Sequence, residues 1–261
     1  MCDLFRRSTI LVAISFLLFF PACQSSQKSL ATEEKVNSEP REGKHLLILS
    51  GQSNMVGLDA NRSFTPLIEK AFGKEKIIVV KDAHGGQSIR SWCKENHEFP
   101  PPTAGRIPKV RGDLYRRLIN KVQSAMEDHN ISTYTFIWMQ GESDLRNKAY
   151  HIYLKELLSQ LQKDLGTDSI NVVIGRISDH GLNSPKRLEG RKYIRKTQAE
   201  FAEALSRGDW VNTDDLNQRF INGKLIDDLH YTKEGYHTLG QRFAEKSISL
   251  IVKHDSGKVL K

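Results

Sequence analysis

Cysteine is scarce in this sequence, with three residues in a chain of 261. Cys2 and Cys23 lie in an N-terminal segment that differs in composition from the rest, which leaves Cys93 with no second cysteine in the folded part for a disulfide. A small fold held together by disulfides is therefore excluded. We expect the folded part to be stabilised by its core alone.

Two further patterns are missing. The formal net charge is +8, but the lysine and arginine residues are scattered and form no basic stripe interleaved with aromatics, so nucleic acid is not an expected partner. The nine histidines include no His-x-x-x-His pair and no His/Cys cluster with ligand spacing. We therefore expect no metal and no other cofactor.

The sequence also lacks a hydrophobic run long enough to span a bilayer comfortably. The N-terminal apolar run, residues 8–20, has 13 residues, whereas a spanning helix needs about 20. Arg6 and Arg7 precede it, and this order of a charged and then an apolar region is typical of an export signal, predicted here as residues 1–22.

The end of this signal resembles a bacterial lipoprotein cleavage box. Small Ala22 stands directly before Cys23, which makes Cys23 a candidate for lipidation, although Phe20 stands where leucine is usual. A plain cleaved signal and an uncleaved anchor are the alternatives. We expect an exported protein, either in a bacterial cell envelope (lipid-anchored or periplasmic) or secreted, with membrane contact only through an N-terminal lipid.

The rest of the chain divides into a tether, one domain and a short tail. Residues 23–43 are polar, mixed in charge and nearly free of apolar side chains, so we expect a flexible tether there. Residues 44–253 are long enough for one domain with a sizeable core. Residues 254–261 form the predicted C-terminal tail.

Apolar runs alternate with helical patterns along the predicted domain. Short buried-strand runs and amphipathic helix patterns that follow one another in this way predict an α/β fold with a parallel sheet. In such sheets ligands bind at the carboxyl ends of the strands. The predicted strands are residues 45–50, 76–80, 134–139, 171–177 and 209–212, and the predicted helices are residues 114–126, 150–165, 188–205 and 232–248.

The first two strand ends carry a serine and a glycine pair. Ser53 lies in Gly-Gln-Ser-Asn-Met directly after the first strand, where it is either a nucleophile on a tight turn or a helix cap. Gly85 and Gly86 follow the second strand, where they form either a simple turn or backbone N–H donors for an oxyanion. Trp92, further on, is either a surface for a sugar ring or part of the core.

Two more segments carry polar side chains suited to acyl transfer. Gln140, after the third strand, can donate its amide N–H groups to an oxyanion, and nearby Glu142 is a supporting acid or an ordinary helix-start residue. Histidine is a residue type suited to act as a general base, and His230 lies before the last helix. Asp227, three residues earlier, can accept a bond from its other ring nitrogen.

Together, the order Gly-Gln-Ser-Asn-Met, Gly-Gly, Gln-Gly-Glu-Ser-Asp and Asp-x-x-His resembles the SGNH (GDSL-like) hydrolases, and within them the sialate O-acetylesterase and acetyl xylan esterase branch. The resemblance implies a flavodoxin-like three-layer α/β/α sandwich with a five-stranded parallel sheet. It also implies the site: Ser53 as nucleophile, His230 as base and Asp227 as its partner. The implied oxyanion hole combines Gln140 with the backbone N–H groups of Ser53 and of Gly85 or Gly86.

The predicted function is hydrolysis of acetyl groups on a carbohydrate, such as xylan or sialic acid, through an acetyl-enzyme. A lipase or thioesterase acting on longer acyl chains and a non-catalytic glycan-binding module are the alternatives. An Arg195-x-x-Gln198 pair also resembles the branch, without an assigned role.

Overall fold

Five strands pair into one parallel sheet in the protein, which we describe from a computed structural model covering residues 43–94 and 112–255. The strands are β1 (Lys44–Gly51), β2 (Ile77–Ala83), β3 (Ile131–Met139), β4 (Ile170–Gly175) and β5 (Gly208–Val211). All five were predicted from the sequence, with small shifts at their ends. The predicted signal segment, Cys23 and most of the predicted tether lie outside the described residues, so those expectations stay predictions.

The strand order is β2-β1-β3-β4-β5, and each neighbouring pair is parallel. Because β1 lies between β2 and β3, the chain leaves β1 toward one side of the sheet and later returns to its other side. Ligand sites of open α/β sheets lie at such switch points, beyond the carboxyl ends of the strands. The sheet order therefore places the residues after β1 and β3 at the expected site.

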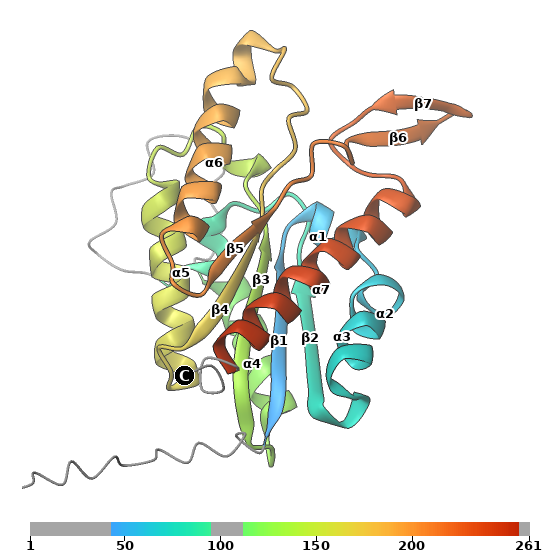
Figure 1. The fold of residues 1–261 in the computed structure, drawn as a ribbon. Helices are drawn as coiled ribbons and strands as arrows, with labels where there is room; N and C mark the ends of the chain where they lie inside the picture. The colour runs from blue at the N-terminus through green and yellow to red at the C-terminus, as the bar shows by residue number, and fades with distance from the viewer. Residues whose placement is uncertain (1–42, 95–111, 256–261) are drawn as a thin grey trace, which may run out of the picture. The chain divides into compact units, whose positions relative to one another are not determined.

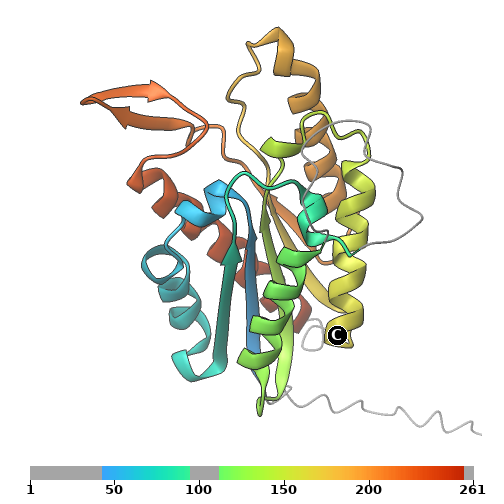
Figure 2. The ribbon, with the colours of Figure 1, turned by 180° about the vertical axis from the view of Figure 1, so that it is seen from behind.

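The sheet is covered by helices on both faces, as Figures 1 and 2 show from opposite sides. Side chains of a strand alternate between its faces. Leu46 and Ile48 pack in one core cluster, and Leu47 and Leu49 pack in the other. The first cluster includes residues of α4 (Asp113–Met126), α5 (Tyr150–Leu165) and α6 (Pro185–Glu203); the second includes residues of α1 (Ser53–Gly57), α2 (Ala60–Ser63), α3 (Thr65–Phe72) and α7 (Lys233–Asp255). The predicted three-layer α/β/α sandwich is confirmed.

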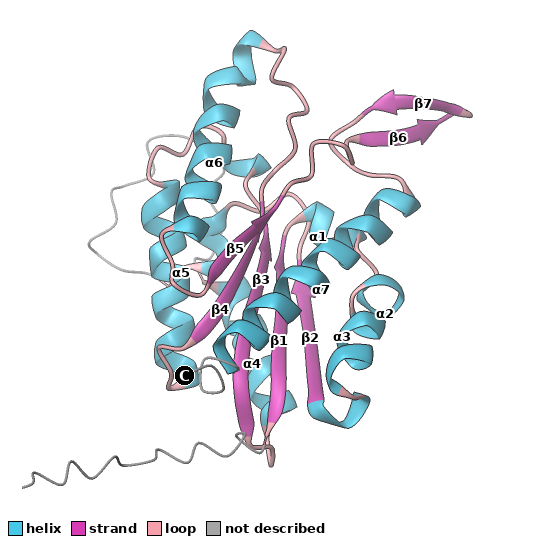
Figure 3. Ribbon diagram, viewed as in Figure 1, coloured by secondary structure: helices cyan, strands magenta, loops and turns pink. Residues whose placement is uncertain are grey.

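The four predicted helices are α4, α5, α6 and α7. The hydroxyl of Thr232 accepts a hydrogen bond from the Gly235 N–H at 2.9 Å and so caps α7, as predicted. The sequence interpretation missed the short helices α1 to α3 and an antiparallel hairpin of β6 (Gln218–Ile221) and β7 (Lys224–Asp227), which Figure 3 shows projecting beyond the sheet. Three 3-10 turns complete the described elements: η1 (Lys74–Lys76), η2 (Ile89–Trp92) and η3 (Glu142–Asp144).

Trp92 belongs to the core. It is fully buried, and its ring meets that of Trp138 edge-on at a centroid distance of 5.1 Å. Stacking of Trp92 on a sugar ring is therefore excluded in this structure, and the core alternative holds. Within the described residues, no helix is both long and apolar enough to cross a membrane.

Candidate active site

Ser53 begins α1, directly after the end of β1. The turn needs glycine at position 51, because its φ is 145° and a Cβ there would lie 2.0 Å from the Met139 carbonyl oxygen. The Gln52 N–H donates to that same oxygen at 2.8 Å, which fixes the turn against the end of β3. The sequence therefore places a half-buried serine at the switch point of the sheet.

The glycine pair after β2 lies beside this serine, as predicted. A Cβ built on Gly85 would stand 3.9 Å from the Ser53 Cβ, and Gly86 has a left-handed φ of 67°. The His84 N–H donates to the Gly51 carbonyl at 3.0 Å, so the two turns are bonded to each other. Bare backbone thus approaches the Ser53 side chain, as an oxyanion hole of N–H groups requires.

Asn54 joins the serine turn to the histidine loop, a role that the sequence interpretation did not assign. This fully buried side chain donates to the Leu229 carbonyl at 3.1 Å and to Oε1 of Glu142 at 3.0 Å. Its own oxygen accepts from the Tyr236 hydroxyl at 3.1 Å. Because Asn54 follows Ser53 and Leu229 precedes His230, the bond to Leu229 holds the two predicted catalytic segments together.

The predicted partner of His230 does not contact it. Oδ2 of Asp227 lies 3.0 Å from Nδ1 of His180, whereas Nδ1 of His230 lies 3.4 Å from Oδ1 of Asp228. The Asp228 carboxylate also accepts from the His230 backbone N–H at 2.8 Å, which forms a short turn and directs the carboxylate toward the ring. The carboxylate beside His230 is thus that of Asp228, and the predicted Asp227–His230 contact is corrected.

Gln140 is also placed differently from the prediction. Its fully buried side-chain nitrogen faces three acceptors: Oδ2 of Asp144 at 2.6 Å, the Gln87 carbonyl at 3.0 Å and Oε1 of Gln52 at 3.2 Å. An amide nitrogen has only two hydrogens, so protein acceptors occupy both. In this structure Gln140 supports the glycine turn through Gln87 and does not direct a free donor at Ser53.

Asp144 is the centre of the network around this turn. Its buried carboxylate accepts from the Ser88 hydroxyl at 2.7 Å, the Ile89 N–H at 2.8 Å and the Asn147 amide at 2.9 Å, in addition to Gln140. The sequence interpretation assigned no such role to Asp144. No local signal indicates it, because Ser88 and Ile89 are more than fifty residues away.

Glu142 is a second carboxylate near His230. Burial raises its pKa above the ordinary value of 4.5, while Arg191, the Asn54 hydrogen bond and His230 favour its charged form. Oε2 of Glu142 and Nε of Arg191 are both buried and make no hydrogen bond with another described residue. The structure therefore places a carboxyl group with a raised pKa beside Asn54, near the histidine loop, and its supporting role stays a prediction.

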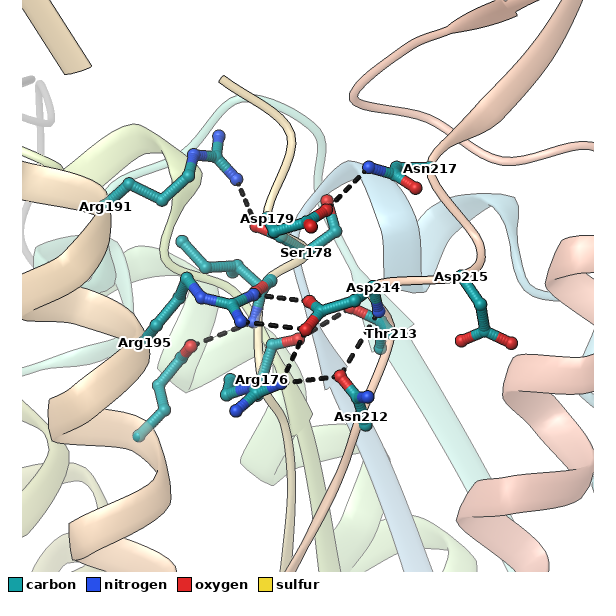
Figure 4. Close-up of polar contacts among 12 residues, drawn as sticks. Arg176, Ser178, Asp179, Arg191, Arg195, Asn212, Thr213, Asp214, Asp215 and Asn217 are labelled. Carbon is teal, nitrogen blue, oxygen red and sulfur yellow. Dashed lines mark hydrogen bonds and ion pairs between the residues drawn. The ribbon is translucent and has the colours of Figure 1, made fainter. Parts of the chain in front are cut away.

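The Arg195-x-x-Gln198 pair has a structural role. Gln198 donates to the Gln140 carbonyl at 2.7 Å and accepts from the Ile177 N–H at 2.9 Å. Arg195 forms a two-bond ion pair with Asp214, at 2.5 and 2.9 Å, and Arg176 reaches the same carboxylate at 2.8 Å, as Figure 4 shows. The pair thus fixes the loop after β3 and the loops after β4 and β5 to α6.

Among the described residues, no three His, Cys, Asp or Glu side chains gather in a way that could hold a metal ion.

The sheet order, the serine turn, the facing glycine turn and the histidine loop agree with the SGNH-type hydrolase class that the sequence motifs resemble. More particularly, the chain belongs to the family of carbohydrate esterases described as sialic acid-specific acetylesterases, whose profile matches residues 56–249. The resemblance inferred from the sequence motifs is confirmed. Comparison with curated proteins finds no match.

Two solved structures show the same fold. A protein from Arabidopsis thaliana is 19% identical with a TM-score of 0.58, over 79% of this chain and 98% of that one. A carbohydrate acetylesterase from Xanthomonas citri is 14% identical with a TM-score of 0.55, over 78% of this chain. The present chain spans 56% of the length of the Xanthomonas protein.

Proposed function

We propose that this protein is a serine esterase that removes O-acetyl groups from a carbohydrate, with Ser53 as nucleophile and His230 as base. The observation that carries the proposal is the bond from Asn54 to the Leu229 carbonyl, which joins the residues adjacent to Ser53 and His230. The nearness of Gly85 to the Ser53 side chain adds backbone donors beside the nucleophile. Membership of a carbohydrate esterase family supports the substrate class.

The proposed reaction has two acyl-transfer steps. The Ser53 hydroxyl oxygen attacks the acetyl carbonyl carbon while His230 takes its proton, and backbone N–H groups of Ser53 and the Gly85–Gly86 turn stabilise the oxyanion. The C–O bond to the sugar then breaks, and His230 returns the proton to the sugar oxygen. Water attacks the acetyl-enzyme in the same way, releasing acetate and restoring Ser53.

Asp228 supports the imidazolium that forms during each step, because its carboxylate is the nearest to Nδ1 of His230. Gln140 acts indirectly, by holding the Gln87 carbonyl and with it the glycine turn. Glu142 and Asn54 hold the loop that carries His230.

The test is hydrolysis of p-nitrophenyl esters from acetate to octanoate by the wild type and by Ser53→Ala, with exposed Ser249→Ala as the matched control. We expect the wild type to hydrolyse p-nitrophenyl acetate, kcat to fall at least a thousandfold in Ser53→Ala, and kcat to be unchanged in Ser249→Ala. Acetylated xylan and an O-acetylated sialate are tested next.

Two outcomes contradict the proposal. Rates that rise with acyl chain length indicate a lipase or thioesterase, and glycan binding without turnover of any ester indicates a binding module.

A further inference from the structure

The β6–β7 hairpin is exposed over its whole length. All ten residues from Gln218 to Asp227 are exposed, and Figures 1 and 2 show the hairpin projecting from the layered part of the molecule. Its two-residue turn has a left-handed backbone at both positions, with φ of 50° at Asn222 and 75° at Gly223. An Asn-Gly turn of this kind matches the natural twist of the strands, so the hairpin is a preformed arm.

The strand register gives the two faces of this arm different chemistry. Residues directly opposite each other in an antiparallel pair lie on the same face. Phe220 is opposite Leu225, and these two side chains, 62% and 47% exposed, form an apolar patch on the face that they share with Gln218 and Asp227. On the other face Arg219 is opposite Ile226 and Ile221 is opposite Lys224, so that aliphatic and basic side chains alternate.

The apolar and basic side chains of the arm are exposed and can contact a binding partner. Four of the seven large hydrophobic side chains that are exposed among the described residues lie on it: Phe220, Ile221, Leu225 and Ile226. Neither of the basic side chains, Arg219 and Lys224, forms an ion pair with another residue in the described part of the chain. Apolar side chains gathered on one exposed element mark an interaction surface.

Both ends of the arm are fixed to the loop between β4 and α6. Asn217, before β6, donates to Asp179 at 2.8 Å, a contact that Figure 4 shows, and Asp227, at the end of β7, lies 3.0 Å from His180. The Asp228 N–H closes the base of the arm by donating to the Asn217 carbonyl at 3.1 Å. Since His230 follows two residues later, whatever binds the arm is held close to the proposed base.

The positive charge of Arg219, on the basic face, also acts on Tyr236, a residue next to the proposed site. Burial raises the pKa of Tyr236, and the positive charge of Arg219 opposes that rise. Tyr236 bonds Asn54, the residue after the proposed nucleophile. The charge of Arg219 therefore acts on a residue that contacts the serine turn.

We propose that the β6–β7 arm binds an anionic polysaccharide, holding the sugars next to the one whose acetyl group is removed. Sugar rings have C–H faces that pack on aromatic and aliphatic side chains, as Phe220 and Leu225 provide on one face of the arm, and acidic sugars carry carboxylates that pair with Arg219 and Lys224 on the other, so the polymer crosses the edge of the arm. A second copy of the chain is a poorer occupant of the basic face, because a symmetric contact through that face brings like charges together. The proposal rests on the carbohydrate esterase function and names the kind of polymer that the enzyme acts on.

The test compares two double variants of the full chain, Phe220→Ser/Leu225→Ser and Arg219→Gln/Lys224→Gln. Val252→Ser is the apolar control, because Val252 is as exposed as Leu225, at 47%, and lies near the end of α7. Lys192→Gln/Lys196→Gln, on exposed positions of α6, is the charge control. Acetate release is measured from p-nitrophenyl acetate, acetylated polygalacturonate and neutral acetylated glucomannan.

We expect both arm variants to hydrolyse p-nitrophenyl acetate within twofold of the wild type and to show at least a fivefold higher KM on acetylated polygalacturonate. The Arg219→Gln/Lys224→Gln variant should raise the KM for glucomannan less than the KM for polygalacturonate. Both control variants should hydrolyse all three substrates as the wild type does. An unchanged KM on polygalacturonate in both arm variants overturns the proposal. An equal loss on both polymers in the basic variant overturns the anionic preference.

Binding is measured separately from catalysis, by the retardation of Ser53→Ala in gels that contain polygalacturonate. If the arm substitutions abolish this retardation, the arm binds the polymer, even if Ser53 proves not to be the nucleophile. The two proposals can therefore fail separately. Two results overturn the proposal if polymer retardation stays unchanged. Loss of a dimer in the Phe220→Ser/Leu225→Ser variant indicates that the arm binds a second copy of the chain. Loss of sedimentation with vesicles of anionic phospholipid in that variant indicates that the arm binds a lipid surface.

Discussion

At the scale of single residues, the histidine loop offers two adjacent carboxylates with different partners. Asp227 is the last residue of β7 and pairs with His180, while Asp228 begins the turn that ends at His230. The distance of 3.4 Å between Asp228 and the His230 ring is longer than a normal hydrogen bond. We expect this contact to shorten when His230 becomes charged, because charge-assisted hydrogen bonds are the shorter ones.

Asp228→Asn should therefore lower kcat on p-nitrophenyl acetate by about a hundredfold or more, since a carboxylate that stabilises the imidazolium is lost. Asparagine keeps the oxygen that accepts from the His230 N–H, so the turn is retained. Asp227→Asn is the matched control, and its kcat should stay within about threefold of the wild type. The reverse order of effects would assign the role to Asp227, as the sequence motif predicted.

The motif residues could be found from the sequence, but the groups that hold them could not. Ser53, Gly85 and His230 each follow or precede a recognisable element, so their meeting at one edge of the sheet follows from the α/β pattern. Asn54 and Asp144 have hydrogen-bond partners 55 to 182 residues away, and these contacts can be predicted only when the sheet order is known. The side chain of Gln140 was misjudged because an amide at a strand end can face either the substrate or the protein.

At the scale of elements, the strands and long helices were predictable because each has a buried face that leaves a pattern in the sequence. β1 and β4 each contain a continuous apolar run, residues 46–49 and 172–174, because both of their faces are covered by helices. The hairpin left no such pattern, because all eight of its strand residues are exposed and two strands of four residues form without a core. Its Asn-Gly turn was the available signal.

Asn54 connects three elements, and its removal tests whether that connection matters for catalysis. Asn54→Ala leaves Glu142, the Leu229 carbonyl and the Tyr236 hydroxyl without their bonds, which should cost about 1–3 kcal/mol of stability. It should also lower kcat at least tenfold, because the loop that carries His230 loses its bond to the serine turn. Chemical denaturation and ester kinetics measure the two effects.

The matched control is Asn171→Ala. Asn171 is equally buried and bonds Thr135 at 3.3 Å, but it lies near the start of β4, at the opposite end of the sheet from the site. We expect a loss of stability there with kcat unchanged. Equal losses of kcat in the two variants would mean that Asn54 stabilises the fold but does not position the loop that carries His230.

At the scale of the whole molecule, one carboxylate behind the site couples folding to pH. Burial raises the pKa of Glu142 above its ordinary value of 4.5. A carboxyl group whose pKa is raised on folding favours the folded state while it is protonated, and that contribution is lost as the pH rises through the folded pKa. Other groups titrate as well, so the effect of Glu142 appears only as a difference between two variants.

Glu142→Gln replaces the carboxyl with a neutral group of the same shape that keeps an oxygen for Asn54. The melting temperature of this variant relative to the wild type should therefore increase from pH 4.5 to pH 8, because the wild type alone must ionise a buried group. Thermal unfolding at several pH values in this range measures the difference. Glu200→Gln, at an exposed position of α6, should show no comparable trend, whereas a pH-independent difference for Glu142→Gln would mean that Glu142 ionises as readily in the folded chain as in the unfolded one.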